Sequence, residues 1–343
     1  MKLTILAYLL FACSAAHSQT RQSPITILDS SHDCSIRGMS IPSNRVIWIS
    51  GSNGHVAKST DGGKTWKWML VAGYEKTDFR AIHAFDSTRV IIMGVGNPAY
   101  ILKTKDGGQS WKLVYTKDTV GMFLDAMDFR NEQEGICIGD PIDAGGGKKK
   151  FFVIRTHDGG DTWQQQSPSV TPVEGEAVFS ASGSNIALLD SKDFDYAFIS
   201  GGSASNLYLI GKLGKANKVY PLRINKGTES SGAFSMATDG RNKFYSIGGD
   251  YKNPDEAKDN FVWTADGGKS WQTPLGAQPS GYRSCIRIIK GKQMVACGTN
   301  GVDVCDEPNK WRHISAEGFN VCRVSLDGKM VFFGGGKGRV GRM

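Results

Sequence analysis

Hydrophobic and polar positions along this chain repeat as short apolar runs separated by turns, with few helix-like periodicities. Seven runs are nearly continuous, which indicates strands buried on both faces; they span 46–49, 90–93, 135–138, 196–199, 244–247, 294–297 and 330–333. A shorter segment precedes each run and is interpreted as the inner strand of the same unit, beginning at 35, 79, 124, 176, 232, 282 and 319. The units average roughly 46 residues, within the range of propeller repeats. The pattern therefore predicts an all-β, seven-bladed β-propeller of four-stranded blades.

One octet recurs after the third segment of several units. Its first copy is Ser59-Thr60-Asp61-Gly62-Gly63-Lys64-Thr65-Trp66. Three more full copies carry Asp106 with Trp111, Asp158 with Trp163, and Asp266 with Trp271; a decayed copy keeps Asp306 and Trp311. The Gly pair permits a tight turn with positive φ, and the carboxylate can accept hydrogen bonds from turn amides and from the Ser/Thr hydroxyl. We expect the tryptophan to pack beneath the turn, which makes these residues structural rather than catalytic.

These octets are Asp-box, or BNR, motifs. Together with the sevenfold repeat they make the chain similar to Asp-box propellers of the photosystem II stability and assembly factor family. The resemblance covers residues 30–343 and implies a propeller that acts as a binding or assembly module. It is specific for the fold and weak for activity, because sialidases, xyloglucanases and sortilin-type receptors also carry Asp boxes.

The first residues predict export. Lys2 precedes an apolar run from Leu3 to Ala12, and Ala16-His17-Ser18 fits a signal peptidase site, so we expect a signal peptide over 1–18 and a single propeller domain over 19–343. A lipoprotein is the alternative, because residues 10–13 loosely resemble a lipobox ending in a cysteine. Residues 24–28 lack a partner strand in their own unit, and we expect them to supply the outer strand of the last blade and so close the ring.

Charge and cysteines restrict the partners only modestly. The formal net charge of +8 becomes +7 once Lys2 leaves. With export, an acidic protein, an anionic glycan or another carboxylate ligand is a better electrostatic partner than nucleic acid. Six cysteines remain after the signal, at 34, 137, 285, 297, 305 and 322, and either disulfides or buried thiols suit them. We expect a monomer without a transmembrane segment.

A charged ring is predicted at one mouth of the central channel. In a four-stranded blade, loops that enter the inner strand and loops after the second strand share one face, opposite the Asp boxes. The position that opens each inner strand is, in blade order, Arg37, Arg80, Asp125, Glu176, Gly232, Arg283 and Asn320. The three arginines could bind a carboxylate, sulfate or phosphate. Alternatively, Asp125 and Glu176 neutralise them in a self-satisfied ring.

Loops after the second strands add Asn97, Asp140 and Asp250 to this face. Asx residues beside Gly or Pro are mostly turn formers. The loops at 140–150 and 250–260 are long, however, and long loops on a rigid scaffold often carry recognition.

Two functions fit this face. The first is docking of a protein or glycan through Arg37, Arg80, Arg283, Asn320 and Asn97. The second is glycoside hydrolysis of the sialidase or xyloglucanase type, which needs two carboxyl groups in one cleft; the candidates are Asp125, Glu176, Asp140 and Asp250. The Arg-Ile-Pro segment usual in sialidases is absent, since Ser40 precedes Ile41-Pro42, and xyloglucanases usually pair two propellers.

Redox chemistry finds no support in the sequence. No strand–GxGxxG–helix unit is present for a dinucleotide, and no Cys/His spacing resembles a zinc site. We expect neither a cofactor nor a metal, and docking is preferred over hydrolysis.

Overall fold

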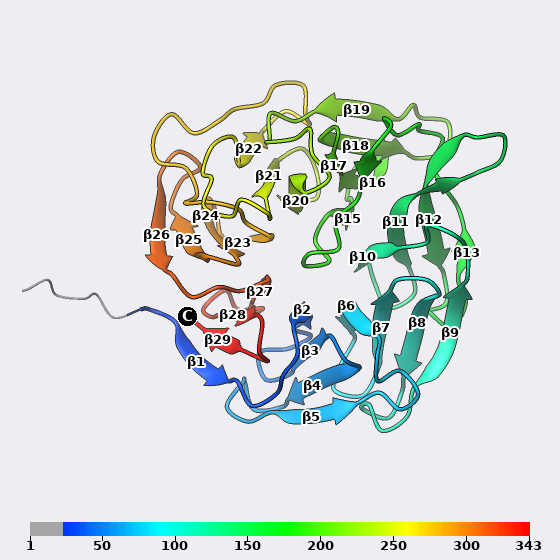
Figure 1. Cartoon of the computed structure of the whole chain (residues 1–343), viewed down its shortest axis with the longest axis vertical. Coiled ribbons are helices and arrows are strands. Elements are labelled where there is room, and N and C mark those ends of the chain that lie inside the picture. The colour runs from blue at the N-terminus through cyan, green and yellow to red at the C-terminus, as the bar shows by residue number, and fades with distance from the viewer. Residues whose placement is uncertain (1–22) are drawn as a thin grey trace, which may run out of the picture.

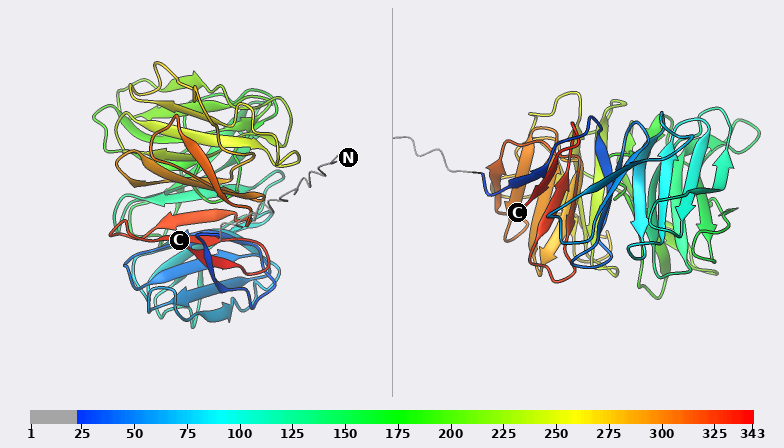
Figure 2. Two further views of the ribbon diagram at one scale, coloured as in Figure 1. Left: turned by 90° about the vertical axis from the view of Figure 1, so that its left-hand side faces the viewer. Right: turned by 90° about the horizontal axis from the view of Figure 1, so that it is seen from below.

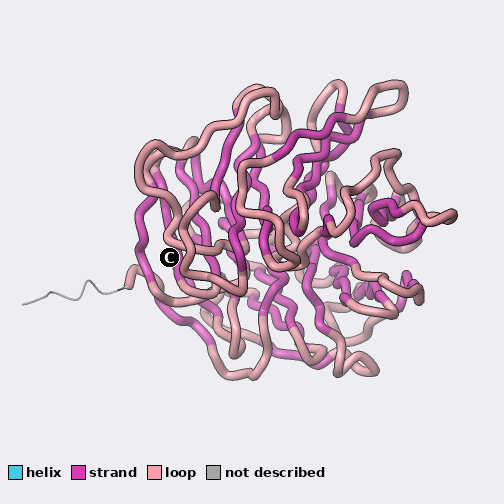
Figure 3. Tube along the Cα trace, turned by 45° about the horizontal axis from the view of Figure 1, so that its top comes forward, coloured by secondary structure: helices cyan, strands magenta, loops and turns pink. Residues whose placement is uncertain are grey.

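The computed structural model describes residues 23–343, so the expected signal peptide and its cleavage site lie outside the described residues. Seven antiparallel sheets surround a central axis (Figure 1). The described part of the chain contains strands and loops but no helix (Figure 3), and hence no helix that could cross a membrane. The seven-bladed propeller predicted from the repeats is confirmed.

Strand bounds follow the blades in chain order. Blade 1 contains β2 (Ile36–Ser40), β3 (Ile47–Gly51), β4 (His55–Ser59) and β5 (Lys67–Leu70); blade 2 contains β6 (Asp78–Ala84), β7 (Val90–Val95), β8 (Ala99–Thr104) and β9 (Lys112–Lys117). Blade 3 contains β10 (Leu124–Phe129), β11 (Gly135–Asp143), β12 (Lys149–Thr156) and β13 (Gln164–Gln165); blade 4 contains β15 (Ile186–Leu188), β16 (Phe194–Ile199), β18 (Asn206–Gly211) and β19 (Lys218–Pro221). Blade 5 contains β14 (Glu176–Ala177), β17 (Gly201–Gly202), β20 (Ser231–Thr238), β21 (Phe244–Asp250) and β22 (Phe261–Thr264); blade 6 contains β23 (Cys285–Lys290), β24 (Gln293–Gly298), β25 (Gly301–Cys305) and β26 (Trp311–Ser315). Blade 7 contains β27 (Val321–Val324), β28 (Val331–Gly334), β29 (Val340–Arg342) and β1 (Thr26–Asp29).

The N-terminal strand closes the ring. β1 runs antiparallel to β29, with Thr26 opposite Arg342 and Ile27 opposite Gly341. The blue and red ends of the chain therefore lie side by side in both views of Figure 2. Closure covers the edge that β29 would otherwise expose, which removes a site for unwanted strand pairing. The prediction for residues 24–28 is confirmed.

The inner strand of blade 4 differs from the sequence interpretation. It is β15, whose Ile186 and Leu188 pair with Phe198 and Tyr196 of β16. The segment that starts at Glu176 instead forms β14, which pairs with β17 and extends the sheet of blade 5. Two apolar segments precede β16, and the one joined to it by the shorter connection forms the hairpin. Blade 5 also lacks a full fourth strand of its own, since its Asp-box hairpin returns as the single bridge between Trp263 and Gln272.

The core lies mainly between neighbouring blades. One cluster joins Trp48 and Val56 of blade 1 to Val90, Ile92 and Leu102 of blade 2, all with 0% exposure. All six cysteines of the described residues are free and buried, so the structure shows no disulfide among residues 23–343. Those thiols therefore pack as small apolar groups.

Deleting residues 19–30 should destabilise the whole ring. The deletion removes β1, which exposes the edge of β29, and it removes the side chain of Ile25 (7% exposed) from the core. We expect a lower melting temperature and rapid limited proteolysis. Two point variants provide a matched pair: Ile25→Ala should cost about 2–5 kcal/mol, whereas Ile27→Ala, at a position 42% exposed, should cost much less. A protease-resistant, fully folded truncation would contradict the closure argument.

Candidate functional site

The Asp boxes brace hairpins at one end of the blades. Asp61 accepts hydrogen bonds through Oδ1 from the backbone N–H groups of Lys64 (2.9 Å) and Thr65 (3.0 Å), and through Oδ2 from the Thr65 hydroxyl (2.6 Å). These bonds lower the pKa of Asp61, with the Thr65 hydroxyl as the largest cause. Gly63 needs its positive φ of 84°, and a Cβ there would approach Phe332 of blade 7 to 2.9 Å. The turn thus also fits against the neighbouring blade.

The other three full boxes repeat this arrangement. Hydroxyl and amide donors surround Asp106, Asp158 and Asp266 in the same way. The tryptophans contribute packing, since the indole N–H groups of Trp66, Trp111, Trp163 and Trp271 are buried and find no acceptor within residues 23–343. The boxes follow the third strand of their blades, because Ser59 ends β4 opposite Ile47 at the start of β3. The inner strands begin at the other end, where Ile36 pairs with Gly51.

A segment of the chain crosses the central channel. We call residues 177–184 the plug; it leads into β15, and in Figure 1 the green chain before β15 reaches toward the middle of the ring. Its polar contacts reach five blades, through Ser180 to Arg80 and to the Asp125 carbonyl, Ser182 to the Ser284 carbonyl and to Arg323, and Ser184 to Ser235. The plug consequently separates a cavity at the inner-strand starts from one at the inner-strand ends.

We call the first of these the entrance cavity. It has a volume of about 530 Å³ and lies at the predicted ring. Its lining includes 177–181 of the plug, the charged residues Arg37, Arg80, Asp125, Asp140 and Glu229, and the aromatic residues Phe123, Phe179, Phe234, Tyr251 and Tyr282. Apolar walls with a few charged groups are typical of ligand sites.

Two of the three predicted arginines meet in the entrance cavity. Arg80 donates from Nε to Asp78 at 2.7 Å and from Nη1 to the Ser180 carbonyl at 3.3 Å. Arg37 makes no hydrogen bond or ion pair with any of the described residues. Burial, and then the nearby charge of Arg80, lowers the pKa of Arg37. The cavity therefore contains a guanidinium whose donors are available to a ligand.

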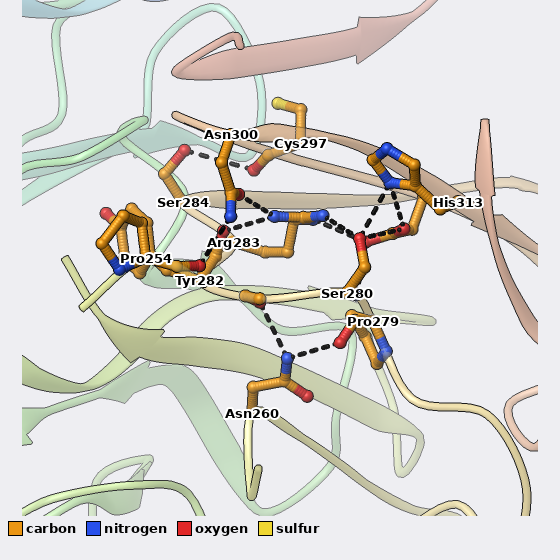
Figure 4. Close-up of polar contacts among 12 residues, drawn as sticks. Pro254, Asn260, Pro279, Ser280, Tyr282, Arg283, Ser284, Cys297, Asn300 and His313 are labelled. Carbon is orange, nitrogen blue, oxygen red and sulfur yellow. Dashed lines mark hydrogen bonds and ion pairs between the residues drawn. The ribbon is translucent and has the colours of Figure 1, made fainter. Parts of the chain in front are cut away.

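Arg283 does not join them, so its prediction as a ring residue is wrong. Its side chain is 0% exposed and donates from Nε to Asp303 at 2.6 Å. Its other nitrogens donate to the Tyr282 carbonyl, Asn300 and Ser280 (Figure 4). Asp303 on β25 attracts the guanidinium into the blade, and sequence spacing alone does not reveal this partner.

Asp125 of the predicted ring and Asp140 of the neighbouring loop both line the entrance cavity, but they are enclosed to different degrees. Both oxygens of Asp125 are buried and accept no hydrogen bond from a described residue. Burial, and then the charge of Asp140, raises the pKa of Asp125 well above its usual value. Asp140 is less enclosed; its Oδ1 accepts a hydrogen bond from the Val178 N–H at 2.9 Å, and burial raises its pKa to about 6. Asp125 thus lies within the wall, whereas Asp140 borders the cavity.

Glu176 and Asp250 have structural partners. Glu176 accepts hydrogen bonds from Ser200, from Asn206 (2.9 Å) and from the Tyr208 hydroxyl (2.8 Å), and it belongs to β14 rather than to the inner strand of blade 4. Asp250 accepts from the Lys252 N–H and the Asn253 amide, and so closes a turn. A self-satisfied ring would require Glu176 to pair with an arginine of the cavity. Glu176 pairs with neither Arg37 nor Arg80.

The two predicted asparagines also serve local structure. Asn320 borders the entrance cavity but donates to Ser35 and to the Ile36 carbonyl, which joins blade 7 to blade 1. Asn97 accepts a hydrogen bond from the Thr119 N–H at 3.0 Å and precedes the cis peptide bond to Pro98. It does not line the entrance cavity.

Sequence reasoning missed the aromatic wall and the plug. Phe179 stacks on Phe234 with ring centroids 4.0 Å apart, and Tyr282 contacts Phe234 edge-on at 4.8 Å. Phe234 and Tyr282 lie in the inner-strand segments that begin at 232 and 282, so the available signal was an aromatic residue next to or near the ring position in both segments. The plug had a weaker one, the small-residue run 180–184 before an apolar segment.

The fold and its braced hairpins define the chain as an Asp-box β-propeller. Residues 17–121 match the model of a family described as photosynthesis system II assembly factor YCF48. The resemblance to that family expected from the octets is therefore confirmed. A search of curated proteins finds no match.

Solved structures of similar shape include YCF48 propellers. YCF48 bound to D1 peptide has 17% identity and a TM-score of 0.64, over 94% of this chain and 97% of that one. YCF48 from Cyanidioschyzon merolae has 12% identity and a TM-score of 0.65, over 93% and 98%. The propeller of U3-55K has 11% identity and a TM-score of 0.62, over 93% and 97%. At such identities the likeness shows the fold.

Replacing Arg283 by Leu should destabilise the protein by about 3–5 kcal/mol, because Asp303 would remain buried without its cation. The double variant Arg283→Leu/Asp303→Leu should recover much of this loss. Arg37→Leu, at the equivalent inner-strand position, is the control and should change the free energy of unfolding little. Urea denaturation measures all three, and equal effects of Arg283→Leu and Arg37→Leu would refute the assignment.

Asp125→Asn should stabilise the protein at high pH. A carboxyl group whose pKa is raised on folding contributes stability that is present below its unfolded pKa and is lost as the pH rises through its folded pKa. The variant should therefore match the wild type near pH 4 and exceed it at pH 8 by roughly 1–3 kcal/mol. Thermal unfolding across this range tests the expectation, with exposed Asp118→Asn as the control. A variant that is less stable at pH 8 would show that Asp125 has a partner.

Proposed function

We propose that the entrance cavity docks a carboxylate-bearing segment of a partner protein. The observation that carries this proposal is Arg37, which borders the cavity without a partner among the described residues. The second guanidinium, that of Arg80, lies close enough to lower the pKa of Arg37. A carboxylate between them would remove this repulsion and could accept hydrogen bonds from both planar groups.

The walls support a peptide rather than a bare anion. Phe123, Phe234, Tyr251 and Tyr282 offer aromatic faces around the two arginines. Aromatic residues and arginine are the side chains that most often dominate the energy of protein interfaces. A segment with a carboxylate and at least one apolar side chain would use both kinds of surface.

The comparisons support the same class of ligand. One solved propeller of similar fold, YCF48, has a bound D1 peptide. For this chain we infer a protein partner of the same general kind, in an assembly role rather than a catalytic one. The signal-like residues 1–18 favour a partner encountered after export.

Glycoside hydrolysis is the weaker proposal. Hydrolysis needs two carboxyl groups that reach the sugar from within one cleft. Of the four candidates, Glu176 and Asp250 have structural partners and Asp125 is enclosed, which leaves Asp140 alone at the cavity surface. Turnover of an aryl glycoside that Asp140→Asn abolishes would reverse this ranking.

Docking can be tested with fluorescein-labelled peptides of about ten residues that carry aromatic and apolar side chains and end in either a free carboxylate or a carboxamide. Since hydrogen bonds to charged groups are worth about 1.5–3 kcal/mol, the free acid should bind at least tenfold more tightly than the amide. Arg37→Gln should abolish this preference. Fluorescence anisotropy measures the affinities.

Exposed Arg223→Gln is the matched control, since it removes the same charge outside the cavity. It should leave the preference for the free acid unchanged. Equal binding of acid and amide by the wild type, or an unchanged preference in Arg37→Gln, would rule out carboxylate recognition at this cavity.

A further inference from the structure

A second cavity, which we call the exit cavity, lies where the inner strands end, on the face with the Asp boxes. It is open to solvent and has a volume of about 420 Å³. Every blade contributes to it through its inner strand, and the plug contributes Gly183 and Ser184. It shares no lining residue with the entrance cavity. A ligand there would therefore be independent of the docking proposed above.

Two arginines on adjacent inner strands line the exit cavity in the same pose. Arg287 of β23 donates from Nη1 to the carbonyl of the preceding residue at 2.8 Å, and Arg323 of β27 does the same at 2.9 Å. Arg323 also donates from Nη2 to the Ser182 carbonyl at 3.2 Å. Neither arginine forms an ion pair within the described part of the chain. Burial, and then the charge of Arg287, lowers the pKa of Arg323 to about 10.

Among the residues that line the exit cavity, cations outnumber carboxylates. Behind this lining, the Cys285 sulfur accepts a hydrogen bond from Arg323 Nη1 at 3.7 Å. Burial lowers the pKa of His83 to about 4, so this ring is neutral at pH 7. Asp128 accepts a hydrogen bond from the Leu188 N–H at 2.8 Å and forms no ion pair with either arginine, although their charges act on it. Two cations thus face at most one carboxylate.

We propose that the exit cavity binds a small aliphatic monocarboxylate between the guanidinium groups of Arg287 and Arg323. A planar carboxylate has two oxygens and can accept hydrogen bonds from both groups at once. Asp128 on the same wall disfavours a dianion such as phosphate. The apolar part of the lining supplies the site for the chain; it comprises Met39, Ile41, Ile82, Met127, Met236 and Ile288.

The proposal can be tested by calorimetry with four probes: hexanoate, acetate, hexanamide and inorganic phosphate. Each probe is titrated into the protein. Hexanoate should bind more tightly than acetate, by up to about fourfold for each buried methylene. Hexanamide, which keeps the chain and lacks the charge, should bind at least tenfold more weakly than hexanoate. Phosphate should not compete.

Variants locate the site. Arg287→Gln should weaken hexanoate binding at least tenfold, and Arg287→Lys should lie between it and the wild type, because lysine keeps the charge but loses the planar donor pair. Arg37→Gln, in the entrance cavity, should leave unchanged the part of hexanoate binding that Arg287→Gln weakens, which separates this proposal from the docking function.

Absence of hexanoate binding, or equal binding of hexanoate and hexanamide by the wild type, would overturn the proposal without any variant. Preferential binding of phosphate would overturn the monocarboxylate class. Unchanged hexanoate binding by a folded Arg287→Gln protein would place the ligand elsewhere.

Discussion

Closure of the ring by β1 against β29 is the constraint on which the other features depend. The blades bury their apolar faces on one another, so each interface needs a neighbour on both sides. One cluster illustrates this need, because it joins Ile25 and Val340 of blade 7 to Ile36 and Ile49 of blade 1 and to Val295 of blade 6. An open ring would leave such a cluster without one wall. With the ring closed, the inner strands hold fixed positions around the axis, and their side chains can form cavities.

The plug then divides the axis into two environments. Its backbone carbonyls at Ser180 and Ser182 accept hydrogen bonds from Arg80 and Arg323, one arginine on each side. Each cavity therefore has an arginine anchored on the plug and a second arginine beside it. The anchored arginines, Arg80 and Arg323, already use some of their N–H groups in hydrogen bonds to the plug. Arg37 and Arg287 have more N–H groups free to donate to a ligand. In each cavity one arginine is held in place by the plug, and its neighbour keeps N–H donors that are free. This arrangement is suited to binding an anion.

The sequence predicts the architecture well because the signals are local and repeated. Apolar runs ending in Gly and the octet around Asp61 report strand order and hairpin position, and the closing strand follows from an unpartnered segment. The site is predicted less well because it depends on contacts between distant residues. Arg283 and Arg37 occupy equivalent positions, yet only Arg283 has Asp303 within 2.6 Å. Glu176 does not open the inner strand of blade 4, because Ile186–Leu188 forms the hairpin with β16 instead, and strand periodicity does not resolve this competition.

The contrast between Arg283 and the unpaired arginines also bears on function. Burying a cation costs free energy unless hydrogen bonds and a counter-charge compensate. Arg283 is fully enclosed and has both, so it needs nothing from outside the chain. Arg37 and Arg323 are partly enclosed and lowered in pKa, and no carboxylate pairs with either among residues 23–343. Packing alone does not favour an unpaired cation in the wall of a cavity. An anion bound from outside would supply the counter-charge that offsets the free-energy cost of burying it. Unpaired guanidinium groups, rather than arginine positions in the repeat, are therefore the feature shared by the two sites proposed for this propeller.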